Sequence, residues 1–161
     1  MIKLKPARDK SLRRHHPWIF SGAVASVSGK PKAGDTVDVV SADGKPLARA
    51  AYSPESQIRA RVWSFDAARE VDAAFFRERV TRALALRESL PAAKHSNALR
   101  LVHGESDGLP GLIVDRYADV LVAQFLAAGV ERWRDPILDA LMELTGCAAI
   151  TRGFFPARWR A

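Results

Sequence analysis

The sequence has one cysteine and no apolar run of the length that crosses a bilayer. A transmembrane helix needs about 20 consecutive apolar residues, and the basic N-terminus leads into His and Trp rather than into the apolar stretch of a signal peptide. Cys147 alone can form neither an internal disulfide framework nor a cysteine-based zinc site. We therefore expect a cytoplasmic globular protein with no membrane partner, in which Cys147 is a small buried packing residue.

The motifs of the common catalytic classes are also missing. No Gly-x-Gly-x-x-Gly follows a strand, and the sequence has no P-loop, no Gly-x-Ser-x-Gly and no Cys-x-x-Cys. We expect no catalytic residue, no metal ligand and no cofactor-binding residue in this chain. One cluster of potential ligands, His103, Glu105, Asp107 and Asp115, would suit a metal-assisted hydrolase. Its Asp107-Gly108 and Pro110-Gly111 pairs are instead typical of tight turns.

The positive charge is concentrated at one end of the chain. The protein has 25 Lys and Arg against 18 Asp and Glu, a net charge of +7. Residues 1–34 contain eight of the basic residues and a single acidic one, Asp9, which leaves 17 of each sign in the rest. Such an asymmetry attracts a polyanion, because neutralised phosphates release their counterions. A basic surface that only aids solubility is the alternative.

Turn formers divide the first part of the chain into short segments. Residues 36–40 alternate with Val37 and Val39 on one face, Asp43-Gly44 is a hairpin signal, and further strands are expected near 47–52 and 58–63. This rhythm predicts a small, mostly antiparallel β domain over residues 1–70.

The second part combines helices with strands. Residues 72–90 are predicted to form a helix with Asp72 as its N-cap and Pro91 at its end, so residues 71–97 comprise this helix and a linker. The segments 98–103, 112–115 and 120–126 indicate strands, and residues 130–144 indicate a second helix. We expect a small α+β domain over residues 98–150, which makes the whole chain an α+β protein.

The residues 10–22, which we call the basic–aromatic segment, give the best candidates for binding. Positive charge contacts phosphate, and an aromatic face can stack on an unpaired base. Trp18 is either such a stacking platform or a core residue. On the predicted strand 58–63, Arg59 and Arg61 share one face, where they would meet phosphate or pair with carboxylates. The candidate RNA-binding residues are Lys10, Arg13, Arg14, His16, Trp18, Arg59 and Arg61.

Several motifs together resemble one known family. They are Arg14-His15-His16-Pro17-Trp18-Ile19-Phe20-Ser21-Gly22, then Gly34-Asp35-Thr36-Val37, then Tyr52-Ser53-Pro54-Glu55-Ser56, and then residues 105–117, which read ESDGLPGLIVDRY. Their order and spacing over residues 1–150 are similar to those of the bacterial 23S rRNA cytosine-C5 methyltransferases that begin with a PUA domain.

The resemblance implies a PUA-like β pseudobarrel over residues 1–70 that binds structured RNA, 23S rRNA in that family, followed by a central α+β domain. In the family a further domain binds S-adenosylmethionine and supplies the catalytic cysteine. Cys147 matches that cysteine neither in position nor in its flanking residues. The expected chain is therefore the RNA-recognition portion of such an enzyme, truncated before the catalytic domain and inactive alone.

Two further expectations concern the alternatives and the end of the chain. A stand-alone PUA-type module, whose central domain mediates protein interaction or homodimerisation, is the other function to consider. Residues 151–161 read TRGFFPARWRA, basic and aromatic, and depart from the family pattern. We expect this stretch to be a tail of non-family origin.

Overall fold

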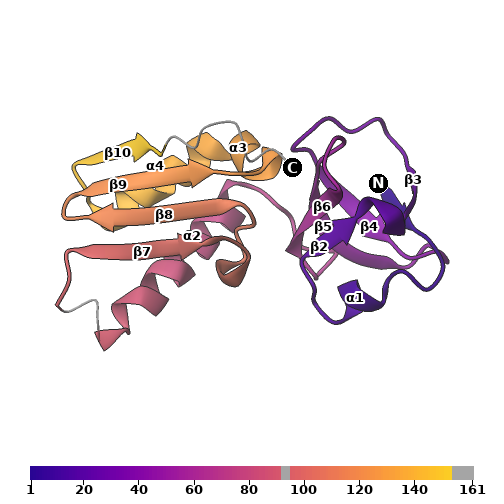
Figure 1. The fold of residues 1–161 in the computed structure, drawn as a ribbon, viewed down its shortest axis with the longest axis horizontal. Helices are drawn as coiled ribbons and strands as arrows, with labels where there is room; N and C mark the ends of the chain where they lie inside the picture. The colour runs from indigo at the N-terminus through magenta and orange to yellow at the C-terminus, as the bar shows by residue number, and fades with distance from the viewer. Residues whose placement is uncertain (92–94, 154–161) are drawn as a thin grey trace. The chain divides into compact units, whose positions relative to one another are not determined.

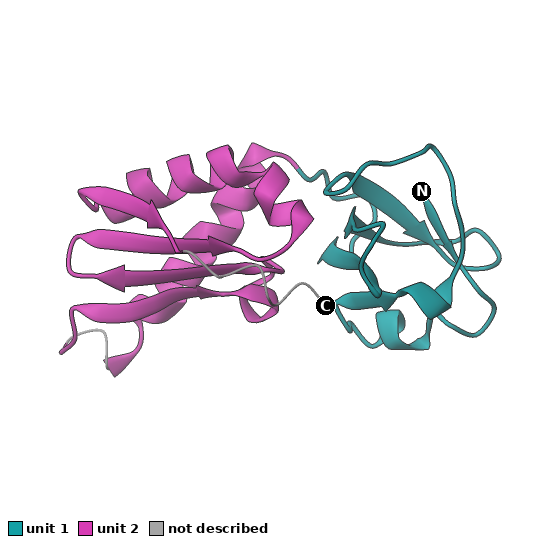
Figure 2. Cartoon of the chain, turned by 45° about the horizontal axis from the view of Figure 1, so that its top comes forward, with its two compact units in different colours: residues 1–71, 161 teal, residues 72–160 magenta. Residues whose placement is uncertain are grey.

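The computed structural model describes residues 1–91 and 95–153, and it divides into two compact units (Figure 2). The first unit comprises Met1–Val71 and the second begins at Asp72. No helix in the described part of the chain is both long and apolar enough to cross a membrane.

The first unit is built on one six-stranded sheet that curls on itself (Figure 1). The spatial order of its strands is β2-β6-β5-β4-β1-β3, so β2 and β3 are the two edges. Only the pair β1–β4 is parallel. The strands are β1 (Ile2–Leu4), β2 (Trp18–Phe20), β3 (Val24–Val27), β4 (Thr36–Val40), β5 (Pro46–Tyr52) and β6 (Ile58–Ser64).

Alternating side chains of these strands fill the core of the first unit. Val37 and Val39 are buried, as the alternation predicts, and Ile19 joins them from the edge strand β2. Ala48, Ala50 and Ala60 line the central strands, where small side chains let the sheet curl closely around the larger ones. The other buried members of this core are Ile2, Leu4, Leu12, Tyr52 and Val62.

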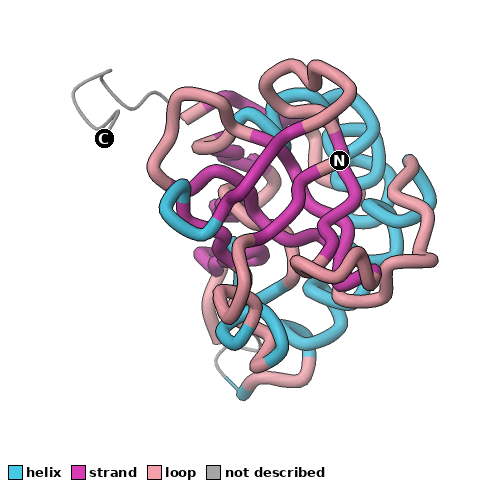
Figure 3. The backbone as a smooth tube through the Cα atoms, turned by 90° about the vertical axis from the view of Figure 1, so that its right-hand side faces the viewer, coloured by secondary structure: helices cyan, strands magenta, loops and turns pink. Residues whose placement is uncertain are grey.

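The sequence predicted β4, β5 and β6 but missed the other elements of the first unit. β1, β2 and β3 have three or four residues each, too few to display an alternating pattern. Two short helical turns were also missed, α1 (Lys10–Arg13) and the 3₁₀ helix η1 (Ser21–Ala23). The tube in Figure 3 shows that the chain enters a strand directly at its N-terminus.

The second unit is a four-stranded sheet with helices on one face (Figures 1 and 2). The strand order is β10-β9-β8-β7, and β10 runs parallel to β9 whereas the other pairs are antiparallel. The strands are β7 (Ala98–His103), β8 (Leu112–Tyr117), β9 (Val120–Phe125) and β10 (Ala149–Arg152). Helix α2 (Ala73–Glu88) packs on β7 and on α4 (Arg134–Thr145).

The helices follow the sequence prediction with two differences. Asp72 caps α2 as expected, because its carboxylate accepts a hydrogen bond from the backbone N–H of Phe75 at 2.8 Å. The helix expected over residues 130–144 is two helices, α3 (Ala128–Arg132) and α4, interrupted at Trp133. Pro136 has no backbone N–H to donate to the preceding turn, so it stands in the first turn of a new helix. The sequence assigned α2 to a separate segment, residues 71–97, whereas the structure has α2 inside the second unit.

A buried ion pair fixes α2 to the turn after β7. Both guanidinium NH₂ groups of Arg87 donate to the carboxylate of Asp107 at 2.6 Å, and the two side chains are only 12% and 4% exposed. Asp107 also accepts the backbone N–H of His103 at 2.6 Å, and Arg87 Nε donates to the Arg100 carbonyl at 3.2 Å. Arg87 is therefore a structural residue of the second unit.

Replacing Asp107 by Ala is expected to destabilise the second unit by about 3–5 kcal/mol, because Arg87 would remain buried without its partner. Urea unfolding followed by far-ultraviolet circular dichroism measures the loss. The matched control is Glu143→Ala, which breaks the exposed pair between Arg77 of α2 and Glu143 of α4 and should cost at most about 1 kcal/mol. Equal losses in the two variants would contradict the structural role of Asp107.

The hairpin between β4 and β5 is closed by Ser41, Asp43 and Lys45. The Ser41 hydroxyl donates to the Asp43 carboxylate and accepts the backbone N–H of Lys45 at 3.0 Å. Lys45 Nζ lies 3.1 Å from Asp43 Oδ2. The hydrogen bond from Ser41, followed by the one from Lys45, lowers the pKa of Asp43 from 3.8 to about 2.

Because this pKa is lower in the folded chain, the hairpin contribution of Asp43 is fully present above pH about 4 and is lost as the pH falls towards 2. An NMR titration of the Asp43 carboxyl group should give a value near 2. The value should rise towards about 3.9 in the Ser41→Ala variant. Lys45→Met, which keeps the hydroxyl group, should raise the pKa less. An Asp43 pKa unchanged by both substitutions would contradict this account.

Candidate nucleic-acid interface

The short helix α1 ends in a turn that directs the chain into the edge strand β2. His15 has a left-handed backbone, φ 60°, and its N–H bonds the Leu12 carbonyl at 2.9 Å. The N–H of His16 reaches back to the Ser11 carbonyl at 3.0 Å. This pair of bonds is the Schellman arrangement that ends many helices, usually with Gly at the left-handed position. Pro17 follows and prevents the helix from continuing.

After this turn, three aromatic side chains alternate along the chain, and we call His16, Trp18 and Phe20 the aromatic row. The ring centroids are 5.9 Å apart for His16 and Trp18, 6.2 Å for Trp18 and Phe20, and 6.4 Å for His16 and Phe20. The Trp18 ring is nearly perpendicular to the other two, at 81° and 83°. Because Ile19 between them is buried in the core, the row lies on the opposite face of β2.

The burial of the aromatic row bears on the core interpretation of Trp18. The side chain that β2 contributes to the core is Ile19, whereas Trp18 is only partly buried and Phe20 is 49% exposed. His16 is exposed, and its Nδ1 accepts the backbone N–H of Trp18 at 3.2 Å. Trp18 is therefore not part of the main core. Phe20 was not among the RNA-binding residues predicted from the sequence. Its position two residues after Trp18 on one strand was the signal available.

The neighbouring strand β6 places the two candidate arginines differently. Arg61 pairs with Trp18 in register, so the two residues occupy adjacent positions on one face of the sheet. Arg59 instead donates a hydrogen bond from its guanidinium to the Pro54 carbonyl, which closes the turn between β5 and β6. Its partner is thus a backbone carbonyl, neither of the two partners that the sequence suggested.

The remaining basic candidates lie in α1 or directly after it. Lys10, Arg13 and Arg14 are all exposed. Arg13 Nε donates to Asp9 at 2.7 Å across one helical turn, and this hydrogen bond lowers the pKa of the Asp9 carboxyl group. Because such a surface pair is weak, it orients the guanidinium group and still allows it to bind an anion.

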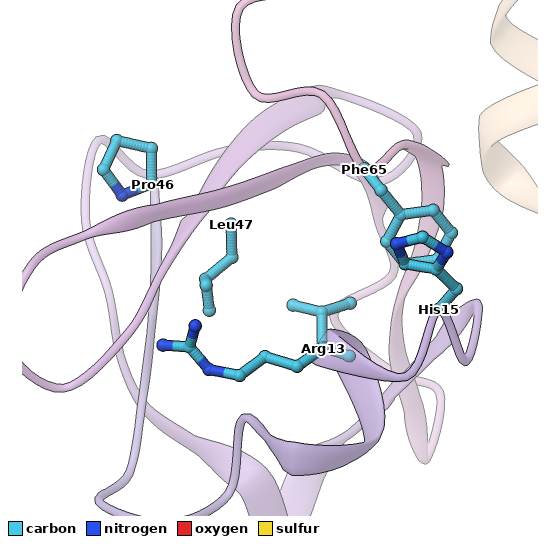
Figure 4. A pocket seen from close by; sticks show the side chains of 6 residues that line it. Arg13, His15, Pro46, Leu47 and Phe65 are labelled. Carbon is cyan, nitrogen blue, oxygen red and sulfur yellow. The ribbon is translucent and has the colours of Figure 1, made fainter.

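A shallow pocket of about 120 Å³ adjoins α1 on the side of Arg13 (Figure 4). Its walls are Leu12, Arg13, His15, Pro46, Leu47 and Phe65. The His15 ring stacks on Phe65 with 4.6 Å between centroids and 30° between planes. This stack holds the left-handed residue in place and ties the end of α1 to the end of β6.

Two carboxylates of the acidic cluster in the second unit are paired with arginines. Asp107 is taken by Arg87, and Asp115 accepts two hydrogen bonds from Arg100 at 2.8 and 3.1 Å. Within residues 1–91 and 95–153, no group of three His, Cys, Asp or Glu side chains is placed to hold a metal ion. Gly108 has φ 68° and ends the 3₁₀ helix η3 (Gly104–Asp107), as expected for a turn.

The geometry of the first unit agrees with one family model. Residues 2–65 match the PUA-like domain. The curled sheet followed by a mixed sheet-and-helix unit confirms the predicted α+β fold, a PUA-like domain with a small α+β domain after it. The expected core position of Cys147 is also confirmed, because it is 6% exposed.

Relatives match over nearly the whole chain. Ribosomal RNA large subunit methyltransferase I of Shewanella denitrificans is 52% identical over 159 residues, which cover 98% of this chain and 40% of that protein. The protein of the same name from Escherichia coli is 52% identical over 143 residues, 89% of this chain and 36% of its own length. The chain thus spans about 40% of the length of these relatives.

A solved structure supports the fold alone. A protein from Streptococcus mutans, named as a candidate SAM-dependent methyltransferase, superposes with a TM-score of 0.77 at 19% identity. The match covers 94% of this chain and 41% of that one.

The coverage also bears on the end of the chain. An alignment over 98% of 161 residues leaves about three residues out, so most of residues 151–161 have a counterpart in the Shewanella protein. This does not support a tail of non-family origin. Thr151 and Arg152 belong to β10, and Arg152 pairs with Glu131 at 2.8 Å. Phe154, Phe155 and Trp159 lie outside the described residues.

Replacing Arg59 by Ala should lower stability rather than remove a ligand contact. The substitution deletes the charge-assisted bond to the Pro54 carbonyl, which is worth about 1.5–3 kcal/mol. Thermal unfolding of the variant should therefore begin at a lower temperature than that of the parent chain. The matched control is Arg8→Ala, which removes an exposed arginine of the same unit. Unfolding midpoints of Arg59→Ala and Arg8→Ala that coincide would contradict this assignment.

Proposed function

We propose that this chain is the RNA-recognition portion of an S-adenosylmethionine-dependent 23S rRNA cytosine-C5 methyltransferase. The observation that carries the proposal is the basic–aromatic segment of the PUA-like domain, where exposed cations lie next to partly exposed aromatic rings. Relatives about 50% identical are named ribosomal RNA large subunit methyltransferases. The sites proposed for RNA are those of Lys10, Arg13, Arg14, His16, Trp18 and Arg61, with Phe20 added.

The pocket beside α1 is too small for S-adenosylmethionine. Sites for ligands of this size are clefts of about 300–1,000 Å³, whereas the pocket beside α1 measures about 120 Å³. Cys147 is buried in the second unit, where it cannot reach a base. We assign this chain a role in binding and orienting RNA.

The electrostatic part of the proposal is tested by the salt dependence of binding to a 23S rRNA fragment. The logarithm of the binding constant should fall linearly with the logarithm of the salt concentration, with a slope of about 0.7–0.9 per phosphate contacted. The double variant Arg13→Ala/Arg14→Ala should bind more weakly and should lose about one unit of slope per contact removed.

The matched control is Lys30→Ala/Lys32→Ala, which removes the same charge from exposed positions in the loop between β3 and β4. If net charge alone attracts RNA, both double variants will lose the same affinity. A local contact instead predicts a clearly larger loss for the arginine pair. No binding of the parent chain to rRNA at low salt would overturn the proposed function.

A further inference from the structure

We propose that the aromatic row is a stacking site for an unpaired nucleobase, with the Phe20 ring as the platform and Trp18 as its support. The inference rests on the proposed function and adds to it the state of the RNA that is bound, single-stranded rather than duplex. It also moves the main stacking role from Trp18, the aromatic residue singled out in the sequence, to Phe20.

The ring geometry assigns these roles. Phe20 is 49% exposed although it belongs to a strand, and Trp18 lies against it at 83° with 6.2 Å between centroids. An edge-to-face contact of this kind is a favourable aromatic arrangement, and it leaves Phe20 49% exposed and thus accessible to another partner. His16 stands 6.4 Å from Phe20 with the planes 39° apart, so a second ring flanks the platform.

The backbone under the row is held at several points. Strand β2 pairs with β6 through Trp18–Arg61, Ile19–Ala60 and Phe20–Ile58. The N–H of Ser21, directly after Phe20, donates to the Gln57 carbonyl at 2.8 Å. The Schellman turn fixes the entry at His16. A platform with a fixed backbone loses little entropy when a base stacks on it.

Cations lie near two members of the row, His16 and Trp18. Arg14 precedes His16 by two residues, so their Cα atoms are separated by at most about 7 Å. Arg61 lies across from Trp18 on the same face. A base on Phe20 would therefore have guanidinium groups within reach of its flanking phosphates, which is the combination of charge and aromatic surface found in proteins that bind single strands.

Duplex RNA cannot use such a platform, since its bases are stacked on one another and their faces are covered. A-form helices are bound through phosphates and 2′-hydroxyl groups, and bases in loops or bulges through stacking. The arginines should thus contribute to both kinds of RNA, whereas the aromatic row should contribute only to unpaired nucleotides.

The test measures binding of the full chain to two probes, single-stranded oligouridylate and a blunt RNA duplex with the same number of phosphates. Phe20→Ala should bind oligouridylate about 5- to 150-fold more weakly, the loss expected for one stacked base. Its affinity for the duplex should stay unchanged. Phe20→Trp should restore or increase oligouridylate binding, whereas Phe20→Leu, which keeps apolar bulk without a ring, should behave like Phe20→Ala.

The control is Val27→Ala, which removes an exposed apolar side chain from the opposite edge of the same sheet and should change neither affinity. Oligouridylate binding that Phe20→Ala leaves unchanged, or that Phe20→Leu retains, would overturn the stacking site. An equal loss for both probes would also overturn it. In these cases RNA binding by the parent chain would still support the proposed function, whereas parent chain that binds neither probe nor rRNA would refute the proposed function itself.

Discussion

The left-handed turn at His15 determines where the candidate interface lies. A non-glycine residue in this conformation costs of order 1–3 kcal/mol, and the surrounding contacts offset that cost. Two helix-ending hydrogen bonds, the stack of His15 on Phe65 and the buried Leu12 all act on the same few residues. Because the turn is held in this way, the next residues enter β2 with Ile19 towards the core and the aromatic row on the other face.

Arginine has different roles in the two units. In the second unit Arg87 and Arg100 each bind a carboxylate through two hydrogen bonds, and Arg77 bridges α2 to α4 through Glu143. The charge of these arginines is neutralised within the unit, and the buried pair of Arg87 with Asp107 also holds its fold together. In the first unit Arg13 and Arg14 remain exposed on a segment with few acidic neighbours. The excess of positive charge therefore coincides with the unit that matches the PUA-like domain.

The sequence predicted best where one pattern extends over many residues. Helix α2 could be placed from its Asp72 cap and its apolar spacing, and β4 and β6 from their alternation. The three-residue strands β1 and β2 could not, because strands this short are stabilised by their neighbours in the sheet rather than by their own composition. The pairing of Arg87 with Asp107 links positions 20 residues apart, which no local pattern encodes. Trp18 and Arg61 were likewise both predicted as RNA-binding residues, but their adjacency on β2 and β6 could not be predicted.

Long-range charge and local aromatic contact solve different parts of RNA recognition. Phosphate contacts bring any RNA to the surface and carry no information about its bases. Aromatic rings on the outer face of an edge strand add selectivity for unpaired nucleotides, since only a base that is not stacked within a duplex can stack on the Phe20 ring. A base can reach these rings because β2 is an edge strand, with a neighbouring strand on one side only. A central strand would have its aromatic rings flanked on both sides, so the position of β2 in the sheet is what makes the aromatic row accessible to a ligand.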